Sequence, residues 1–254
     1  MFTNPPQILS YPLLDSTMDE ARRLLEAERV DTDALTVILA DTQTQARGRH
    51  QRSWYSPPGN FYASFIMPWS YSLNRVGQMS FVYALAVTEA LQTYLPPTLL
   101  LQCKWPNDIL LAGGKLAGIL LETYTSLRES KVFLITGVGI NLVAAPEGSE
   151  LLQATFLQAH LQKPVPIPAL LRSISESLEK WYTLWNREGF SPIREAWLAC
   201  AQAYGKTMTV RLEKNGAPIR GRFIDLDKQG ALVFETFAGA RHHIYAGDVF
   251  FDGR

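Results

Sequence analysis

Hydrophobic and polar positions follow two patterns along this chain, and the change between them falls near Gly205. Upstream of it, apolar side chains recur at helical spacing behind Thr17, across residues 76–94 and from Leu170 to Trp185. Each of these segments is predicted to be a helix with at least one buried face. The first begins with a capping-box pattern, so Thr17 and the serine before it are predicted to lie at a helix N-terminus, which favours anions.

Short apolar runs between these helices predict buried β-strands. A polar Trp-Pro-Asn turn follows the run Leu99–Leu101, which is typical of two strands joined by a turn. Two more strands are predicted at 132–135 and 139–142, where glycines allow close approach of another backbone. Residues 144–150 are predicted to form a loop.

Downstream of Gly205 the pattern changes to short strands separated by turn residues such as Asn215-Gly216. The predicted strands are Met208–Leu212, 221–226, 231–236 and 241–245. About five strands in this length are typical of a small β-barrel. The predicted fold class is α+β, with a mixed sheet and packed helices over residues 1–204 and a small C-terminal β-barrel over residues 205–254.

Composition narrows the class of protein. The 254 residues are 47% apolar, enough for one domain or a domain with a small appendage. The 24 basic and 24 acidic residues cancel, which argues against a broad nucleic-acid-binding surface. No apolar stretch is long enough to span a bilayer, and the start of the chain does not read as a signal peptide. A cytoplasmic protein with reduced Cys103 and Cys200 is therefore expected.

Two lysines and an aspartate stand out in the middle of the chain. The segment Lys104-Trp-Pro-Asn-Asp108 is followed by Lys115-Leu-Ala-Gly-Ile-Leu120, and apolar runs flank both. A lysine embedded in a buried strand is costly unless it meets an anion. The alternative is that both lysines extend along the surface to water.

A basic loop lies upstream of these lysines. Arg47, Arg49 and Arg52 fall within six residues of Ala46–Trp54, and no helical or strand period fits the segment. Guanidinium groups and free N–H groups suit phosphate and carboxylate oxygens, although a solvated loop or a nucleic-acid patch is an alternative. Because the charge is local, a small anionic ligand is favoured. Mutual repulsion of the arginines predicts a loop that is mobile until an anion arrives.

These segments, with others in the same order, resemble the biotin protein ligases. The motifs are Ser16-Thr17-Met18, Gln43 with Ala46-Arg47-Gly48-Arg49, Arg52-Ser-Trp54-Tyr-Ser56-Pro57-Pro-Gly59, Lys104-Trp105-Pro106-Asn107-Asp108, Lys115-Leu-Ala-Gly118-Ile-Leu-Leu-Glu122 and Gly137-Val-Gly139-Ile-Asn141-Leu142. Each motif is weakly specific, but the series runs through nearly the whole chain. The sequence departs from the family at three places: Met18 replaces the usual asparagine, and Ala46 and Gln51 replace loop glycines.

The resemblance implies an ATP-dependent ligase that forms a carbon–nitrogen bond. Biotin and ATP give biotinyl-5′-AMP, and the biotin then passes to a lysine of the biotin carboxyl carrier protein of acetyl-CoA carboxylase. It also implies an SH3-like C-terminal barrel. The sequence leaves open whether the protein is a monomer or a homodimer. Because the motifs begin at Ser16, the short form without an N-terminal helix-turn-helix repressor domain is expected, and no specific DNA binding.

The resemblance also assigns roles to residues. The catalytic residues are Lys115, Arg47, Arg49 and Asp108, and Asp108 either holds Mg²⁺, which ATP mainly carries, or orients the acceptor amine. The biotin-binding residues are Ser16, Thr17, Met18, Gln43, Arg47, Gly48, Arg49, Trp54, Lys115 and Gly118. The residues that bind ATP or the adenylate are Arg47, Arg49, Arg52, Trp54, Lys104, Asn107, Lys115 and Asn141.

Two other functions stay open at this stage. A lipoate ligase would share the fold and the adenylation chemistry, and competition by free biotin but not by lipoate would separate the two. A non-catalytic adenylate sensor or nucleic-acid binder built on the barrel is disfavoured because Lys115 is present.

Overall fold

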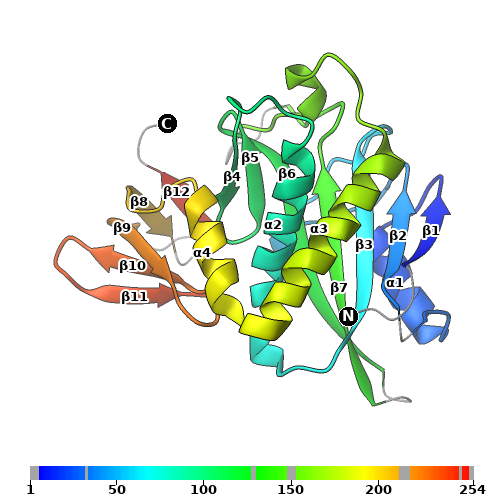
Figure 1. Cartoon of the computed structure of the whole chain (residues 1–254), viewed down its shortest axis with the longest axis horizontal. Helices are drawn as coiled ribbons and strands as arrows, with labels where there is room; N and C mark the ends of the chain where they lie inside the picture. The colour runs from blue at the N-terminus through cyan, green and yellow to red at the C-terminus, as the bar shows by residue number, and fades with distance from the viewer. Residues whose placement is uncertain are drawn as a thin grey trace.

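The structure is a computed structural model that describes residues 6–31, 34–126, 130–147, 153–211, 218–245 and 248–251. Its larger part is a sheet with helices packed on it (Figure 1). In chain order its helices and strands are β1 (Gln7–Tyr11), α1 (Thr17–Glu26), β2 (Thr36–Ala40), β3 (Phe61–Trp69), α2 (Gln78–Gln92), β4 (Leu101–Lys104), β5 (Asp108–Leu111), β6 (Gly114–Ser126), β7 (Lys131–Ile140), α3 (Ile167–Glu188) and α4 (Phe190–Cys200).

The large sheet has seven strands in the order β1-β2-β3-β7-β6-β5-β4. β1 and β2 run parallel and every other neighbouring pair is antiparallel, so the sheet is mixed. Helices α2, α3 and α4 cover one face, and α1 packs on the other face (Figure 1). α1 buries Met18, Ala21 and Leu24 against Ile38 and Ile66 of the sheet.

The C-terminal part is an antiparallel sheet of five short strands in the order β11-β10-β9-β8-β12. Its strands are β8 (Thr207–Arg211), β9 (Ile219–Leu226), β10 (Leu232–Thr236), β11 (Arg241–Ile244) and β12 (Asp248–Phe251). The predicted α+β class with a small all-β C-terminal part is confirmed. Leu212 and the predicted turn at Asn215-Gly216 lie outside the described residues.

One predicted pair of strands is wrong. Residues 132–135 and 139–142 were expected to form separate strands, but Lys131–Ile140 is the single strand β7. The reason is pairing on both edges, because β3 and β6 bond to β7 along its whole length and carry it through Gly137 and Gly139. Asn141 and Leu142 follow the strand instead of ending it.

Specific hydrogen bonds join the larger part of the structure to the turn between β9 and β10 of the C-terminal sheet. The Trp105 indole donates to the Gly230 carbonyl at 3.0 Å, and the Gln78 amide donates to the Lys228 carbonyl at 2.7 Å. The boundary expected at residue 204 falls between α4 and β8, and a division into separate domains there stays a prediction. None of the described helices is long and apolar enough to cross a membrane.

Candidate active site

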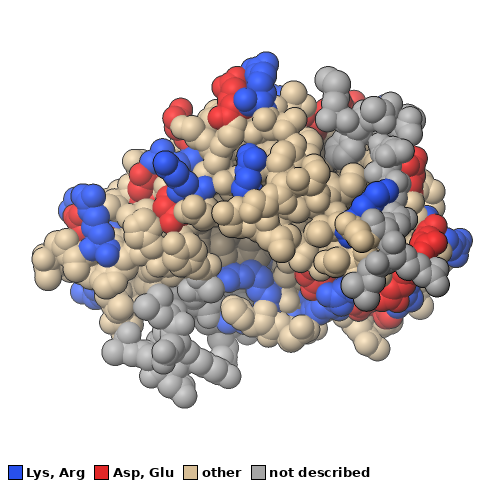
Figure 2. All heavy atoms as spheres, turned by 90° about the horizontal axis from the view of Figure 1, so that it is seen from below, with Lys and Arg blue, Asp and Glu red and all other residues tan. Residues whose placement is uncertain are grey.

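Every site residue expected from the sequence lines a single cleft of about 280 Å³. The cleft lies beside α1, on the face of the large sheet that α2, α3 and α4 leave uncovered, and its floor is formed by β6 and β7. Figure 2 shows a hollow near the centre of the molecule with basic side chains beside it. The predicted residues in the lining are Ser16, Thr17, Met18, Gln43, Arg47, Gly48, Arg49, Arg52, Trp54, Lys104, Asn107, Asp108, Lys115, Gly118 and Asn141.

The N-terminus of α1 forms one wall of the cleft. Ser16 caps the helix, and its hydroxyl accepts a bond from the Met18 N–H at 3.2 Å. The Gln43 side-chain oxygen accepts from the Thr17 N–H at 2.8 Å, and the Ser64 hydroxyl donates to the Thr17 hydroxyl at 2.8 Å. These buried polar groups are therefore fixed by one another before any ligand binds.

Glycines make the floor of the cleft. A Cβ atom added at Gly139 would lie 2.6 Å from the Trp54 ring, and one added at Gly118 would lie 3.0 Å from it. One added at Gly137 would lie 2.9 Å from the Met18 sulfur. The absence of side chains at these positions thus lets Trp54 and Met18 lie directly against the strands.

Lys115 and Asp108 meet within the cleft. Lys115 Nζ lies 2.6 Å from Asp108 Oδ1, and 5.3 Å from the centre of the Trp54 ring. β5 and β6 are adjacent strands, so the hairpin that joins them places both charges on one side. The lysine that was expected to need an anion has an internal carboxylate instead.

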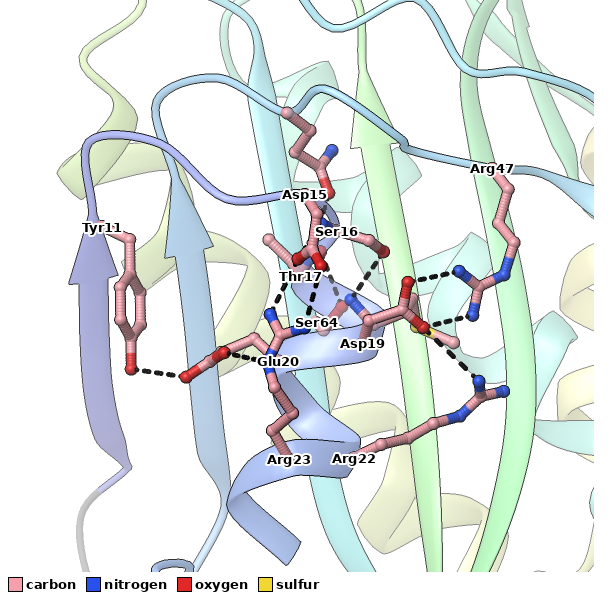
Figure 3. Close-up of polar contacts among 12 residues, drawn as sticks. Tyr11, Asp15, Ser16, Thr17, Asp19, Glu20, Arg22, Arg23, Arg47 and Ser64 are labelled. Atoms are coloured by element: carbon pink, nitrogen blue, oxygen red, sulfur yellow. Dashed lines mark hydrogen bonds and ion pairs between the residues drawn. The ribbon is translucent and has the colours of Figure 1, made fainter.

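Arg47 is paired with acidic residues that the sequence analysis did not include in the site. Its two terminal nitrogens lie 2.7 and 2.8 Å from the two carboxylate oxygens of Asp19 on α1 (Figure 3). One of these nitrogens also lies 3.7 Å from a carboxylate oxygen of Glu122 on β6. These hydrogen bonds lower the pKa of Asp19 and raise the pKa of Arg47. Arg22 also bonds to Glu122.

The loop arginines were expected to repel one another with no compensating negative charge. This expectation is wrong for Arg47, because it considered only the charges within the loop and not the carboxylates outside it. Arg49 and Arg52 also have partners in the structure. Mobility of the loop without a ligand stays a prediction. Asp19 had a signal in the sequence, since it follows the Ser16-Thr17-Met18 motif directly, but it was interpreted only as part of the capping-box pattern of the helix.

The two sequence departures in the loop have different consequences. Ala46 is buried, and its φ is not in the left-handed region. His50 and Gln51 have φ values of 55° and 58°, in the left-handed region that favours glycine. Gln51 therefore has a strained backbone conformation, whereas the glycine that the family has at this position would adopt the same conformation without strain.

The turn between β4 and β5 is held from several sides. The Asn107 amide donates to the Ile119 carbonyl at 2.6 Å, and the Ser80 hydroxyl donates to the Pro106 carbonyl at 3.0 Å. With the Trp105 bond to Gly230, these contacts fix the lysine and the aspartate at the two ends of the turn.

Asn141 connects the end of β7 to the rim of the cleft. Its side-chain nitrogen donates to the Thr155 carbonyl at 3.1 Å, while its side-chain oxygen is buried without a hydrogen-bond partner. The rim residue Ala154 pairs with Lys115, so the same asparagine braces the backbone around that lysine.

Comparisons with known proteins define the class. The biotin/lipoate A/B protein ligase family matches residues 2–141, and the biotin protein ligase C terminal domain matches residues 208–252. A solved structure of the Aquifex aeolicus biotin protein ligase, in complex with biotin and ATP, is 26% identical with a TM-score of 0.75 and covers 96% of this chain and 97% of its own. The fold is therefore that of the biotin and lipoate protein ligases.

Two curated relatives narrow this class. The biotin–[acetyl-CoA-carboxylase] ligase of Paracoccus denitrificans is 35% identical over 243 residues, covering 94% of this chain and 98% of that protein. The bifunctional ligase/repressor BirA of Bacillus subtilis is 31% identical over 247 residues, covering 95% of this chain and 73% of that protein. The chain belongs to the biotin protein ligase family.

Proposed function

We propose that this enzyme activates biotin with ATP and transfers it to a lysine of the biotin carboxyl carrier protein of acetyl-CoA carboxylase, in the cytoplasm. The observation that carries the proposal is the Lys115–Asp108 pair, with 2.6 Å between its charged atoms, in the same cleft as the capped N-terminus of α1. This arrangement provides a cation for two reacting anions and a carboxylate for an incoming amine. The name of the Paracoccus relative supports the carrier as acceptor.

In the first half-reaction a biotin carboxylate oxygen bonds to the α-phosphorus of ATP, and pyrophosphate leaves. Lys115 bridges the carboxylate and the phosphoryl oxygens and offsets their repulsion. Arg49 adds positive charge as negative charge builds on those oxygens. Arg47 acts through its pairing with Asp19, which holds the loop against α1.

An exchange of partners links the two half-reactions. When the anions arrive, Lys115 leaves Asp108 for them, and the Asp108 carboxylate then faces the cleft without its cation. The carrier's lysine attacks the carbonyl carbon of the mixed anhydride, AMP leaves, and an amide forms. Asp108 orients that amine and accepts a hydrogen bond from it, which is the role we favour over metal binding.

The fit of the cleft to Mg²⁺ is limited. Among the described residues of the lining, Asp108 is the one carboxylate, and it is paired with Lys115. Mg²⁺ prefers a full shell of oxygens, so the ATP phosphates and water supply most of its ligands. When bound, the ion neutralises phosphate charge.

The ureido ring of biotin fits the wall formed by α1. Ser16 and Thr17 provide hydroxyl groups, and the Gln43 amide nitrogen provides a donor that makes a long, 3.4 Å contact with the Ser56 hydroxyl. Trp54 covers the apolar part of the ligand from above the glycine floor. Met18 contributes apolar surface where an asparagine would contribute a hydrogen bond. Lys104, Asn107 and Asn141 lie on the side assigned to the nucleotide.

ATP–pyrophosphate exchange tests the proposal. Biotin is expected to stimulate exchange while lipoate does not, and label from biotin is then expected to appear in the purified carrier domain. Exchange that responds to lipoate alone would instead identify a lipoate ligase. Biotin-dependent exchange without transfer to the carrier would overturn the choice of acceptor but not the activation step.

A further inference from the structure

The two cysteines of the chain, Cys103 and Cys200, lie side by side at a position that the ligase reaction does not use. Their Sγ atoms are 3.3 Å apart. Cys103 is on β4 and faces the helices, whereas the next residue, Lys104, lines the cleft on the other face. Cys200 is the last residue of α4, so the pair joins two elements that are distant in sequence.

The backbone around the two thiols keeps them close. The Gln202 N–H donates to the Cys103 carbonyl at 2.9 Å, and Cys103 and Ala201 form a β-bridge. A disulfide has sulfur atoms about 2.05 Å apart, so bonding requires an approach of roughly 1.2 Å. Small rotations of two side chains provide such a distance without moving the paired backbone.

One of the thiols is accessible. Cys103 is completely buried, whereas Cys200 is partly exposed and lines a surface hollow between α2, α3 and α4. Glu89 also lines this hollow, and its carboxylate accepts bonds from Lys180 and Trp181.

The electrostatics of the pair distinguish the two sulfurs. In the neutral pair the Cys200 thiol donates to the Cys103 sulfur. When Cys200 is ionised, a hydrogen bond from the Cys103 thiol stabilises the thiolate, which lowers the pKa of Cys200. The same interaction, together with burial, raises the pKa of Cys103. The accessible sulfur is thus also the one that ionises more easily, and the thiolate is the reactive form.

We propose that Cys103 and Cys200 form a reversible intramolecular disulfide when the protein is exposed to hydrogen peroxide. The Cys200 thiolate attacks one peroxide oxygen, the O–O bond breaks, and water leaves after proton transfer, giving a sulfenic acid on Cys200. The Cys103 sulfur then displaces the hydroxyl group as a second water, so two thiols are oxidised and one peroxide is reduced to two waters. A dithiol reductant restores both thiols.

The disulfide would fasten the end of α4 to β4, which is an edge strand of the large sheet. It would close a loop of nearly a hundred residues, which restricts the unfolded chain more than the folded one. The oxidised protein is therefore expected to melt several degrees above the reduced protein. Because Lys104 follows Cys103 directly, this link fixes the strand that carries a cleft lysine.

The test is to treat the purified reduced protein with stoichiometric hydrogen peroxide and then unfold it for thiol titration and mass measurement. The titre is expected to fall from two thiols to none, with a loss of about 2 Da and a cross-linked peptide that contains Cys103 and Cys200. Dithiothreitol should restore both thiols and the lower melting temperature. Cys200→Ser, which keeps the site's shape, should show no cross-link and no rise in melting temperature.

Three results would overturn the proposal. The first is oxidation of Cys200 to the sulfinic acid with the Cys103 thiol still titratable. The second is a disulfide between two copies of the chain, which migrates as a dimer without reductant. The third is a thiol titre that stays at two after peroxide treatment that oxidises a reference thiol. Each readout is independent of biotin, ATP and ligase activity.

Discussion

The pairing of Arg47 with Asp19 gives the sharpest prediction about the loop. Asp19→Asn keeps the size of the side chain but removes the charge that faces the Arg47 guanidinium. We predict that this variant releases biotinyl-AMP into solution faster than the parent enzyme, because the loop loses its attachment to α1. Released adenylate should label bystander lysines even though adenylation continues.

The magnitude follows from the geometry. Arg47 and Asp19 share two hydrogen bonds of 2.7 and 2.8 Å, and their side chains are 14% and 30% exposed. Hydrogen bonds to charged groups contribute about 1.5–3 kcal/mol, and partial exposure favours the lower end. Because 1.4 kcal/mol corresponds to a factor of ten, release should accelerate about tenfold.

A double-mutant cycle provides the assay. Arg47→Ala should release the adenylate at least as fast as Asp19→Asn, and the double variant should be no faster than Arg47→Ala alone. Glu20→Gln is the matched control, because Glu20 lies on the same helix turn but bonds to Tyr11 and Arg23 instead. Amide exchange of residues 46–54, with and without biotin and ATP, reports the loop directly.

The pH dependence adds an independent check. Pairing lowers the pKa of Asp19 below its ordinary value of 3.8, so the attachment is fully present above that value and is lost as the pH falls through the folded-state pKa. Retention of the adenylate should therefore be constant from about pH 6 to pH 9. The reasoning is refuted if Asp19→Asn retains the adenylate like the parent, or if the two substitutions have fully additive effects.

Three further predictions concern single residues. Lys115→Ala should abolish biotin-dependent pyrophosphate exchange while the circular dichroism spectrum remains that of the folded protein; near-parental exchange would remove Lys115 from its role. Gly139→Ala should raise the KM for biotin, since a Cβ there would lie 2.6 Å from the Trp54 ring, and an unchanged KM would show that Trp54 does not cover the ligand. Gln51→Gly should raise the free energy of unfolding in urea by about 0.5–1 kcal/mol by relieving the left-handed backbone, and a decrease would contradict the strain argument.

Much of the site could be predicted because its chemistry lies on short contiguous segments. The turn from Lys104 to Asp108 carries several site residues within a few positions, and so does the loop around Arg47. Residues so close in sequence are also close in space, so each group could be recognised without a structure. The strand at residues 131–140 illustrates the opposite case. Its glycines resembled a break, and only the strands paired on both edges show why the chain continues through them.

Long-range partners could not be predicted for a different reason. The Trp105 indole bonds to the carbonyl of Gly230, 125 residues away, and nothing local to either residue indicates the other. Asp19 and Arg47 are 28 residues apart, and Asp19 already had a local explanation as a helix-capping acid. When a local pattern already explains a side chain, the sequence gives no reason to look for a second role. Such a role becomes evident only from the tertiary structure.

The internal pairing of the cleft's cations explains how a neutral chain carries a basic site. Lys115 has Asp108, and Arg47 has Asp19 and Glu122, so these partly buried positive charges are compensated before any substrate binds. An unpaired buried cation would cost several kcal/mol in the empty enzyme, whereas a paired one needs only to change its partner. Anionic substrates must then compete with the Asp108 carboxylate for Lys115. Two bound anions together compete more effectively than one anion alone. Such competition favours engagement of Lys115 when biotin and ATP are both present, which is the state in which its charge is needed.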